Sequence, residues 1–289
     1  MSIIEPVIRP PSEAESFLLQ ITTGCSSNNC TFCGAYLDKP FKMKSFKEIE
    51  DDIDNGSNLY KAMRRVFLLD GDALVVNNNK LLPVLKKLNE KFSILSRIAS
   101  YANGYNITIR TQKELGELFE QKLSLIYMGL ESGSQDILNL SKKRSTVEEM
   151  VDAVNKASEC GIKSSVIVLL GLGGKKFSKI HVQETIKALN KMQPRYLSFL
   201  SLMLIPGTDL FNQVQRSEFK ELNSLEMLKQ SYSIIKGLDL RKTIFRSNHA
   251  SNYLSLAGRF PQDKEDLLST LRLAINGEVE LRPEFLRGL

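Results

Sequence analysis

Three of the chain's four cysteines lie within nine residues of one another, and this grouping is the strongest chemical signal in the sequence. They are Cys25, Cys30 and Cys33, in the stretch TTGCSSNNCTFCGAY, whereas Cys160 lies far along the chain. A disulfide needs two thiols and a closed structural zinc site needs four ligands, so three thiols fit neither pattern. Thiolates are the normal ligands of iron–sulfur clusters, and a four-iron cube held by three cysteines leaves one iron open to a small molecule. The spacing therefore predicts a metal site at these cysteines.

Two other interpretations of the cysteines need weighing. Zinc is bound by Cys and His, and the chain's two histidines, His181 and His249, lie far from the cysteines in sequence. Zinc stays open, because a fold that returns His249 to the loop would complete such a site. Three unconnected buried thiols are the second alternative, but Ser and Asn beside the cysteines are poor core neighbours. We expect His181 to be exposed at the start of a helix and assign it no role.

The cysteine loop directly follows the first of six apolar, strand-like segments that alternate with helix-like stretches. The strand-like segments are 17–22, 64–71, 94–102, 123–130, 163–172 and 195–204, and the helix-like stretches are 45–60, 79–91, 111–121, 145–160, 178–192 and 222–236. Several strand segments are apolar at both odd and even positions, as expected of parallel strands covered on both faces. The alternation predicts an α/β fold, either a barrel or a doubly wound sheet. In a barrel, loops at the carboxyl ends of the strands carry the chemistry.

The stretch 145–160 has the clearest helix signals. Ser145 is the expected N-cap, with Glu148 three residues later, and Gly161 supplies the stop. The last forty-odd residues are expected to be irregular, apart from one helix near 263–276.

Composition limits the class of protein. Hydrophobic residues make up 42% and charged residues 25% of the chain, and no apolar run is long enough to span a bilayer. No signal peptide follows Met1, so we expect a cytoplasmic protein with reduced thiols and no membrane partner. The net charge of +6 comes from 39 Lys+Arg against 33 Asp+Glu, and the basic residues are scattered. A small-molecule substrate is therefore favoured over nucleic acid.

The run Cys30-Thr31-Phe32-Cys33, after a strand ending in Thr-Gly-Cys, resembles the cluster loop of the radical S-adenosylmethionine (SAM) superfamily. The usual spacing is C-x3-C-x2-C, and one extra residue here gives C-x4-C-x2-C. The resemblance implies a partial (β/α)6 TIM-type barrel with a [4Fe-4S] cluster on Cys25, Cys30 and Cys33. SAM would chelate the open iron beside Phe32. An electron, from a reductant such as flavodoxin or ferredoxin, would cleave SAM to methionine and a 5′-deoxyadenosyl radical.

Later strand ends carry further parts of the resemblance. Asp70-Gly71-Asp72-Ala73 stands in place of the family's Gly-Gly-Glu-Pro, which implies that Asp70, Gly71 and Asp72 receive the SAM ammonium. An ordinary Asp-Gly turn is the alternative. Gly129-Leu130-Glu131-Ser132-Gly133-Ser134 is similar to the G-x-E-S-G-S segment of cobalamin-dependent, methylthiotransferase-like and coproporphyrinogen-oxidase-like branches.

That second segment implies that Glu131 binds the SAM ribose, with Ser132 beside it. A plain helix N-terminus capped by Ser132 or Ser134 is the alternative, and both can hold together. Arg144 is the residue expected to pair with the SAM carboxylate. Leu170 and Gly171, in the Leu-Gly-Leu-Gly-Gly end of the fifth strand, resemble the segment beside the adenine.

The chain's other features narrow the reaction. One remaining cysteine cannot hold a second cluster, and no D-x-H-x-x-G cobalamin motif or cobalamin domain is expected. We expect a monomeric enzyme with an extended lead at 1–14, a barrel core at 15–210 and an extension at 211–289 that closes the barrel mouth. Its radical would abstract hydrogen from an unidentified substrate. A haem carrier resembling the coproporphyrinogen-oxidase branch, and an RNA-modifying radical enzyme, are the rivals.

The segment 245–253 is the candidate for the substrate end. It is rich in hydrogen-bonding side chains, and we predict that Asn248, His249 and Asn252 face substrate or SAM. The alternative is a buried polar plug that satisfies backbone groups at the open edge of the barrel.

Overall fold

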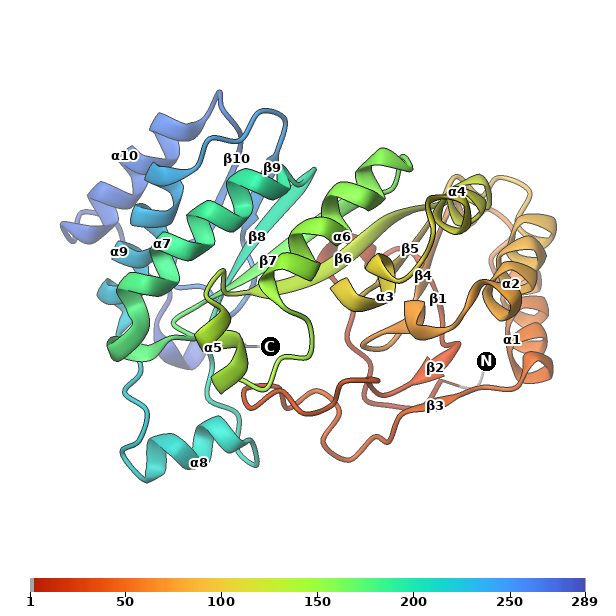
Figure 1. The fold of residues 1–289 in the computed structure, drawn as a ribbon, viewed down its shortest axis with the longest axis horizontal. Helices are drawn as coiled ribbons and strands as arrows, with labels where there is room; N and C mark the ends of the chain where they lie inside the picture. Colours follow the sequence, from red (N-terminus) through yellow and green to blue (C-terminus); the bar gives the residue numbers. More distant parts are fainter. Residues whose placement is uncertain (1–2, 289) are drawn as a thin grey trace. The chain divides into compact units, whose positions relative to one another are not determined.

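The structure, a computed structural model, describes residues 3–288, and these divide into two compact units (Figure 1). Unit 1 contains residues 3–29, 35–128 and 152–164, and unit 2 contains 30–34, 129–151 and 165–288. Each unit is described on its own terms below.

Unit 1 is built on parallel strands. Its sheet order is β1 (Phe17–Leu19), β4 (Arg65–Leu68), β5 (Arg97–Tyr101) and β6 (Leu123–Glu131), and the last three residues of β6 belong to unit 2. A separate antiparallel pair joins β2 (Thr22–Thr23) to β3 (Lys42–Met43). The helical elements are η1 (Pro11–Glu13), α1 (Phe46–Leu59), η2 (Ala73–Val75), α2 (Asn78–Lys91), α3 (Gly104–Thr108), α4 (Gln112–Glu120) and most of α6 (Val147–Glu159).

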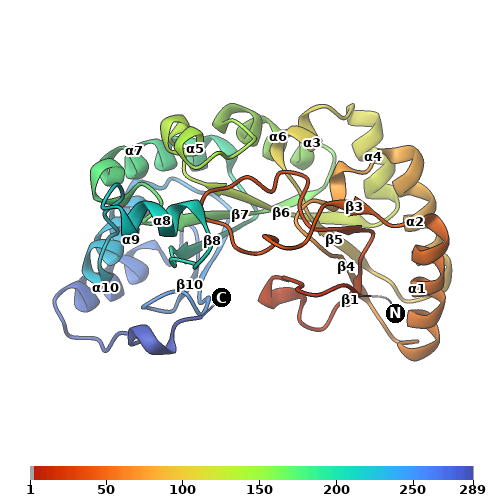
Figure 2. The same ribbon diagram turned by 90° about the horizontal axis from the view of Figure 1, so that it is seen from below.

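Local sequence explains these elements. Val66, Phe67 and Leu68 of β4 are all fully buried, as expected of a parallel strand covered on both faces. Helices α1, α2 and α4 lie on one side of the strands (Figure 2). Ser45 begins α1 through a capping box with Glu48.

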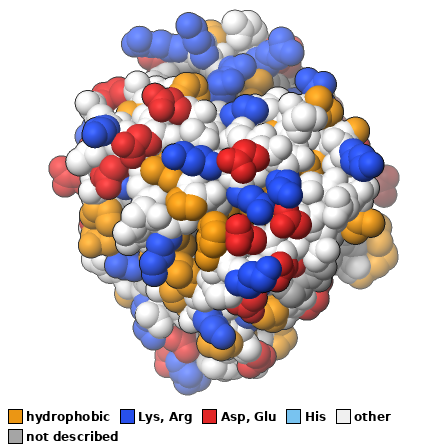
Figure 3. All heavy atoms as spheres, turned by 90° about the vertical axis from the view of Figure 1, so that its right-hand side faces the viewer, with side chains coloured by type: hydrophobic (Ala, Val, Ile, Leu, Met, Phe, Trp, Pro, Cys, Tyr) orange, Lys and Arg blue, Asp and Glu red, His pale blue; other side chains and the backbone are white. Residues whose placement is uncertain are grey.

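The outer face formed by α1 and α2 carries charges of both signs. Lys87 lies 3.3 Å from Glu50 and 3.4 Å from Asp54, and Lys91 lies 2.8 Å from Asp54. Acidic and basic side chains are intermixed across this face (Figure 3). Such a surface lacks the single-sign field that attracts nucleic acid.

Unit 2 continues the α/β pattern. β7 (Lys163–Leu170), β8 (Tyr196–Ser201) and β9 (Ile244–Ser247) are parallel, and β10 (Leu256–Arg259) is antiparallel to β9. Helix α9 packs against both α7 and α10. The helical elements are α5 (Gln135–Leu140), α7 (Gly174–Met192), α8 (Asp209–Gln215), α9 (Ser224–Gly237), α10 (Lys264–Ile275) and η3 (Glu284–Leu286).

The predicted α/β class is confirmed, because each of the six strand-like segments contains one of the parallel strands β1, β4, β5, β6, β7 and β8. A seventh parallel strand, β9, follows β8 in the same sheet. The seven expected helices also form. The domain boundaries at 14/15 and 210/211, and closure of the barrel mouth by the extension, stay predictions.

Three local expectations were wrong. Helix α6 is capped by Thr146 and not by Ser145, since Thr146 Oγ1 accepts from the N–H of Glu149 at 3.1 Å and Glu149 Oε2 accepts from the N–H of Thr146 at 2.9 Å. The region 244–259 is not irregular but forms the β9–β10 hairpin. His181 lies inside α7 and is fully buried. Within residues 3–288, no helix is both long enough and apolar enough to cross a bilayer.

Candidate active site

The predicted site residues fall in both units, and each group is described within its own unit. Unit 1 holds Cys25, Asp70, Gly71 and Asp72; unit 2 holds Cys30, Phe32, Cys33, Glu131, Ser132, Arg144, Leu170, Gly171, Asn248, His249 and Asn252.

Asp70 is a buried anchor for the loop that carries Cys25. Its Oδ2 accepts hydrogen bonds from the N–H of Gly24 and from Gln20 Nε2, both at 2.9 Å, and Lys39 Nζ lies 2.9 Å away. Burial raises the pKa of Asp70, against the lowering effect of the Lys39 ammonium. These protein donors surround the carboxylate, so the structure gives Asp70 a positioning role in unit 1.

Asp72, in contrast, has one carboxylate oxygen that is not used by the surrounding protein groups. Its Oδ2 accepts from Ser26 Oγ and from Asn106 Nδ2, each at 2.5 Å. Its Oδ1 is buried and has no hydrogen-bond partner among the described residues. A buried, unpartnered carboxylate oxygen is costly unless a donor arrives, and an ammonium group would be such a donor. Asp72 therefore fits the role predicted for it.

Gly71 leaves room for the first cysteine. A Cβ at this position would lie 2.7 Å from Cys25 Cβ and 2.9 Å from Cys25 Sγ. The N–H of Gly71 also donates to the carbonyl of Gly24 at 3.1 Å. The two loops thus approach so closely that only glycine fits at this position.

The remaining cysteines lie on a short strap of unit 2. The N–H of Cys33 donates to the carbonyl of Cys30 at 3.2 Å, which closes a turn. Between them, the N–H of Thr31 donates to Ser141 and its carbonyl accepts from Leu210, at 3.0 and 2.9 Å. Phe32 packs on the apolar cluster of Leu202, Leu210, Leu222 and Met227. The strap is therefore fixed by both backbone and core.

The thiols are half-buried, and their surroundings suit ligation. None of the four cysteines is in a disulfide. Burial raises the pKa of the Cys30 thiol, Lys143 lowers it, and Glu131 raises it. No three His, Cys, Asp or Glu side chains between residues 3 and 288 converge as a single-ion site. Three soft thiols are the donor set of an iron–sulfur cluster. One of them, the thiol of Cys25, lies in the space that the missing side chain of Gly71 leaves.

Glu131 ends β6 in a left-handed backbone conformation, with φ of 61°. Its Oε1 lies 3.1 Å from Lys143 Nζ, and both side chains are largely buried. A Cβ at Gly129 would lie 2.0 Å from Glu131 Oε1, so a larger residue there would displace the Glu131 carboxylate. Arg144, the residue predicted to meet the SAM carboxylate, is exposed. Lys143, which pairs with Glu131, was not predicted as a site residue, although it stands beside Arg144 in the same basic run.

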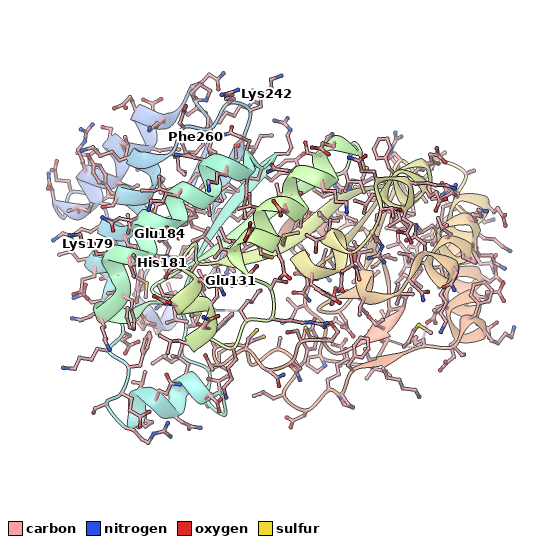
Figure 4. The ribbon with its side chains drawn as sticks, in the orientation of Figure 1. Glu131, Lys179, His181, Glu184, Lys242 and Phe260 are labelled. Atoms are coloured by element: carbon pink, nitrogen blue, oxygen red, sulfur yellow. The ribbon has the colours of Figure 1, made fainter. Side chains whose placement is uncertain are left out.

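Helix α7 holds the segment that follows Glu131. Ser132 Oγ lies 2.9 Å from His181 Nδ1, and the N–H of Gly133 donates to Thr185 Oγ1 at 2.9 Å. Figure 4 shows Glu131 together with His181 and Glu184 of α7. His181 and Thr185 were missed, although their spacing of four residues places both on one helix face. Burial lowers the pKa of His181 to about 4, so the imidazole is neutral at pH 7.

The strand-end glycine of β7 is also fixed. Gly171 has φ of 87°, and its N–H donates to Gln230 Oε1 at 2.8 Å. A Cβ there would lie 3.0 Å from Met227 Cε. Leu170, at the end of β7, is buried.

The predicted substrate residues occupy the loop between β9 and β10. Asn252 is buried: its Nδ2 donates to the carbonyl of Phe199 at 2.8 Å, and its Oδ1 accepts from Ser201 Oγ at 2.9 Å. His249 is half-buried, and its Nδ1 accepts from the N–H of Ser251 at 3.1 Å. Asn248 is exposed. The contacts of Asn252 favour the alternative of a polar plug.

Comparison with known proteins gives a consistent family. A sequence model of the Radical SAM superfamily matches residues 19–189. The chain is 24% identical over 197 residues to the uncharacterised methyltransferase PH0819 of Pyrococcus horikoshii, covering 67% of this chain and 41% of the relative. It is 24% identical over 169 residues to a tRNA uridine(34) acetyltransferase of Methanocaldococcus infernus, covering 57% and 31%.

The fold is similar to coproporphyrinogen III oxidase from Escherichia coli. The TM-score is 0.55 at 16% identity, over 76% of this chain and 52% of that chain. This chain spans less than half the length of the two curated relatives.

Proposed function

Because the chain belongs to the radical SAM superfamily, we propose that Cys25, Cys30 and Cys33 hold its [4Fe-4S] cluster. The protein is an enzyme whose cofactors are that cluster and SAM. The observation that carries the assignment is the family match over residues 19–189, which includes the three cysteines, Asp72 and Glu131.

When bound, the cluster and SAM supply a one-electron reductive cleavage that yields methionine and a 5′-deoxyadenosyl radical. We infer that this radical abstracts hydrogen from a small-molecule substrate. Asp72 Oδ1 would accept the SAM ammonium, and this contact would satisfy the buried oxygen that has no partner among the described residues. Glu131 would accept the ribose hydroxyls, while its ion pair with Lys143 at 3.1 Å holds the carboxylate in place.

The proposal is tested by anaerobic reconstitution with iron and sulfide, followed by SAM and dithionite. We expect a brown protein that forms 5′-deoxyadenosine. A variant with Cys25, Cys30 and Cys33 all changed to Ala should bind no cluster, whereas Cys160→Ala should bind as much iron as the wild type. The proposal would be contradicted if the reconstituted wild type contained no iron, or if the wild type bound zinc instead.

Glu131 provides a second arm of this test. Glu131→Gln removes the charge but not the shape, and we expect SAM to bind about tenfold more weakly, the size of one charged hydrogen bond. Arg144→Met is the comparison, because the sequence predicts that Arg144 pairs with the SAM carboxylate. If that prediction is correct, this variant also binds SAM more weakly. Haem uptake without SAM cleavage would support the carrier alternative.

An RNA-modifying enzyme is the second candidate, favoured by the similarity to the tRNA uridine(34) acetyltransferase and by the net charge of +6. The intermixed charges on the α1–α2 face do not help such a function (Figure 3). An electrophoretic shift of tRNA that persists at moderate salt would support it.

A further inference from the structure

A cavity of about 790 Å³ lies wholly within unit 2, beside the carboxyl end of β8. Leu202, Met203 and Leu204, which follow β8, form one wall. Leu202 belongs to the apolar cluster on which Phe32 of the cysteine strap packs. The volume is within the range of small-molecule sites.

The lining has both apolar and polar residues, and Met203 and Leu204 are partly exposed apolar residues of it. Leu222 and Met227 line it together with the residues that follow β8, and the ring of Tyr253 faces it as well. Leu202, Leu222 and Met227 are each nearly fully buried. Met203 and Leu204 would therefore take the hydrophobic body of a ligand.

Some charged side chains that line the cavity are in ion pairs, and others are not. Lys175 is neutralised by Glu226 at 3.0 Å, and Arg287 by Glu284 at 2.5 Å. Glu221 and Arg282 also line the cavity, and neither forms an ion pair with any residue from 3 to 288. The cavity therefore presents one uncompensated carboxylate and one uncompensated guanidinium.

Arg282 is held in position by the loop that the sequence analysis singled out. Its Nη1 donates to the carbonyls of His249, Ala250 and Asn252, at 3.2, 2.7 and 3.1 Å. The segment 245–253 thus orients a guanidinium through its backbone. Because these bonds use Nη1, the other nitrogens of Arg282 remain to meet an anion in the cavity.

Glu221 comes from a different wall, the loop between α8 and α9. Tyr253 lines the same cavity, and its pKa is raised to about 12, first by burial, then by its hydrogen bond to Glu284, with a contribution from the charge of Glu221.

We propose that this cavity binds a small zwitterion with an apolar side chain, that is, a free α-amino acid or a close analogue. Arg282 would receive its carboxylate and Glu221 its ammonium, while the partly exposed Met203 and Leu204 cover the side chain. This inference rests on the proposed function, since it names the class of substrate that the radical would act on.

The test is calorimetric titration of the reconstituted protein, with SAM present, using L-leucine, L-phenylalanine and L-tryptophan. For phenylalanine, 3-phenylpropionate lacks the ammonium and phenethylamine lacks the carboxylate. We expect at least one amino acid to bind. We also expect each charge-deleted analogue to bind about tenfold more weakly or worse, as for the loss of one charged hydrogen bond.

Glu221→Gln should remove the preference for phenylalanine over 3-phenylpropionate. Glu218→Gln is the matched control, because Glu218 pairs with Arg216 outside the cavity lining. Arg282→Met should remove the preference over phenethylamine; if its melting temperature falls, Glu221→Gln alone decides. Binding of none of the three amino acids, or equal binding of phenylalanine and 3-phenylpropionate, would overturn the inference.

The same preparation is assayed for 5′-deoxyadenosine. Selective amino-acid binding without SAM cleavage would contradict the proposed function and leave the cavity assignment standing. SAM cleavage without amino-acid binding would contradict the cavity assignment and leave the proposed function standing.

Discussion

The backbone N–H of Gly24 donates a hydrogen bond to Asp70 Oδ2 at 2.9 Å, across a sequence separation of 46 residues. Gly24 directly precedes Cys25, and its carbonyl accepts from the N–H of Gly71. The loop after β1 and the loop after β4 are therefore joined at two adjacent points in unit 1. The position of Cys25 depends on a carboxylate that belongs to the next strand.

We expect Asp70→Asn to destabilise the protein and to lower its iron content after reconstitution. The substitution leaves the Lys39 ammonium, which is 4% exposed, without its counter-charge. Breaking one side of a buried pair costs roughly 3–5 kcal/mol, measurable by urea unfolding. Asp51→Asn breaks the exposed pair with Lys47 and should leave stability close to that of the wild type, because solvent screens this pair. Equal unfolding of the two variants would show that Asp70 is no anchor.

Two glycines offer a matched pair of substitutions. Gly71→Ala places a Cβ 2.9 Å from Cys25 Sγ, so either the thiol or the loop must move. We expect less iron per chain. Gly116→Ala, in the middle of α4, meets nothing within 4 Å and should stabilise the helix by about 0.5–1 kcal/mol without changing iron content. Full iron loading of the Gly71 variant would refute the close approach.

The sequence predicts the fold well because its signals are local. Several of the parallel strands contain a run that is apolar on both faces, and β4, with three fully buried residues, is the clearest example. The helix α6 is predicted from its stripe, but its cap is misplaced by one residue. Ser145 and Thr146 are both good caps, and only the backbone turn decides between them.

The parts of the site that escaped prediction depend on distant partners. Asp70 looks like a ligand group in sequence, yet its charge is met by Lys39, 31 residues earlier. Lys143 and Arg144 are neighbours in the chain, and the turn after α5 decides which of them meets Glu131. The β9–β10 hairpin was missed because its strands are only four residues long and carry polar residues.

His181 should give the protein a measurable pH dependence. Burial lowers its pKa from 6.5 to about 4, so the folded state binds fewer protons than the unfolded state between these values. Its contribution to stability is full above pH 6.5 and is lost as the pH falls toward 4. Between pH 6.5 and pH 5 the loss should be about 2 kcal/mol.

His181→Asn removes the titrating group and keeps a side chain that can accept from Ser132. The difference in urea unfolding free energy between the wild type and this variant should therefore shrink as the pH is lowered. Carboxylates titrate equally in both proteins and cancel. A difference that is constant from pH 7 to pH 5 would mean that the buried imidazole is not neutral in the folded state.

Asn252 and His249 separate a structural role from a role at the site. Asn252→Ala removes the acceptor of the buried Ser201 hydroxyl and one of two donors to the carbonyl of Phe199, the other being Ser247 Oγ at 3.4 Å, at a cost of roughly 1–3 kcal/mol. His249→Ala removes one acceptor from the half-buried N–H of Ser251, at a cost of about 1 kcal/mol. Asn248→Ala, at an exposed position, serves as the control for stability and should unfold like the wild type.

The decisive readout compares unfolding with 5′-deoxyadenosine formation per folded molecule, at a temperature where all three variants are folded. If Asn252 is part of a polar plug, its variant loses stability but cleaves SAM at the wild-type rate, because the amide is already fully engaged with protein groups. If it faces SAM or substrate instead, Asn252→Ala loses activity while its unfolding free energy stays close to that of Asn248→Ala. For His249, whose side chain makes fewer contacts, the expected order is reversed, with a small change in stability and the larger change in SAM cleavage.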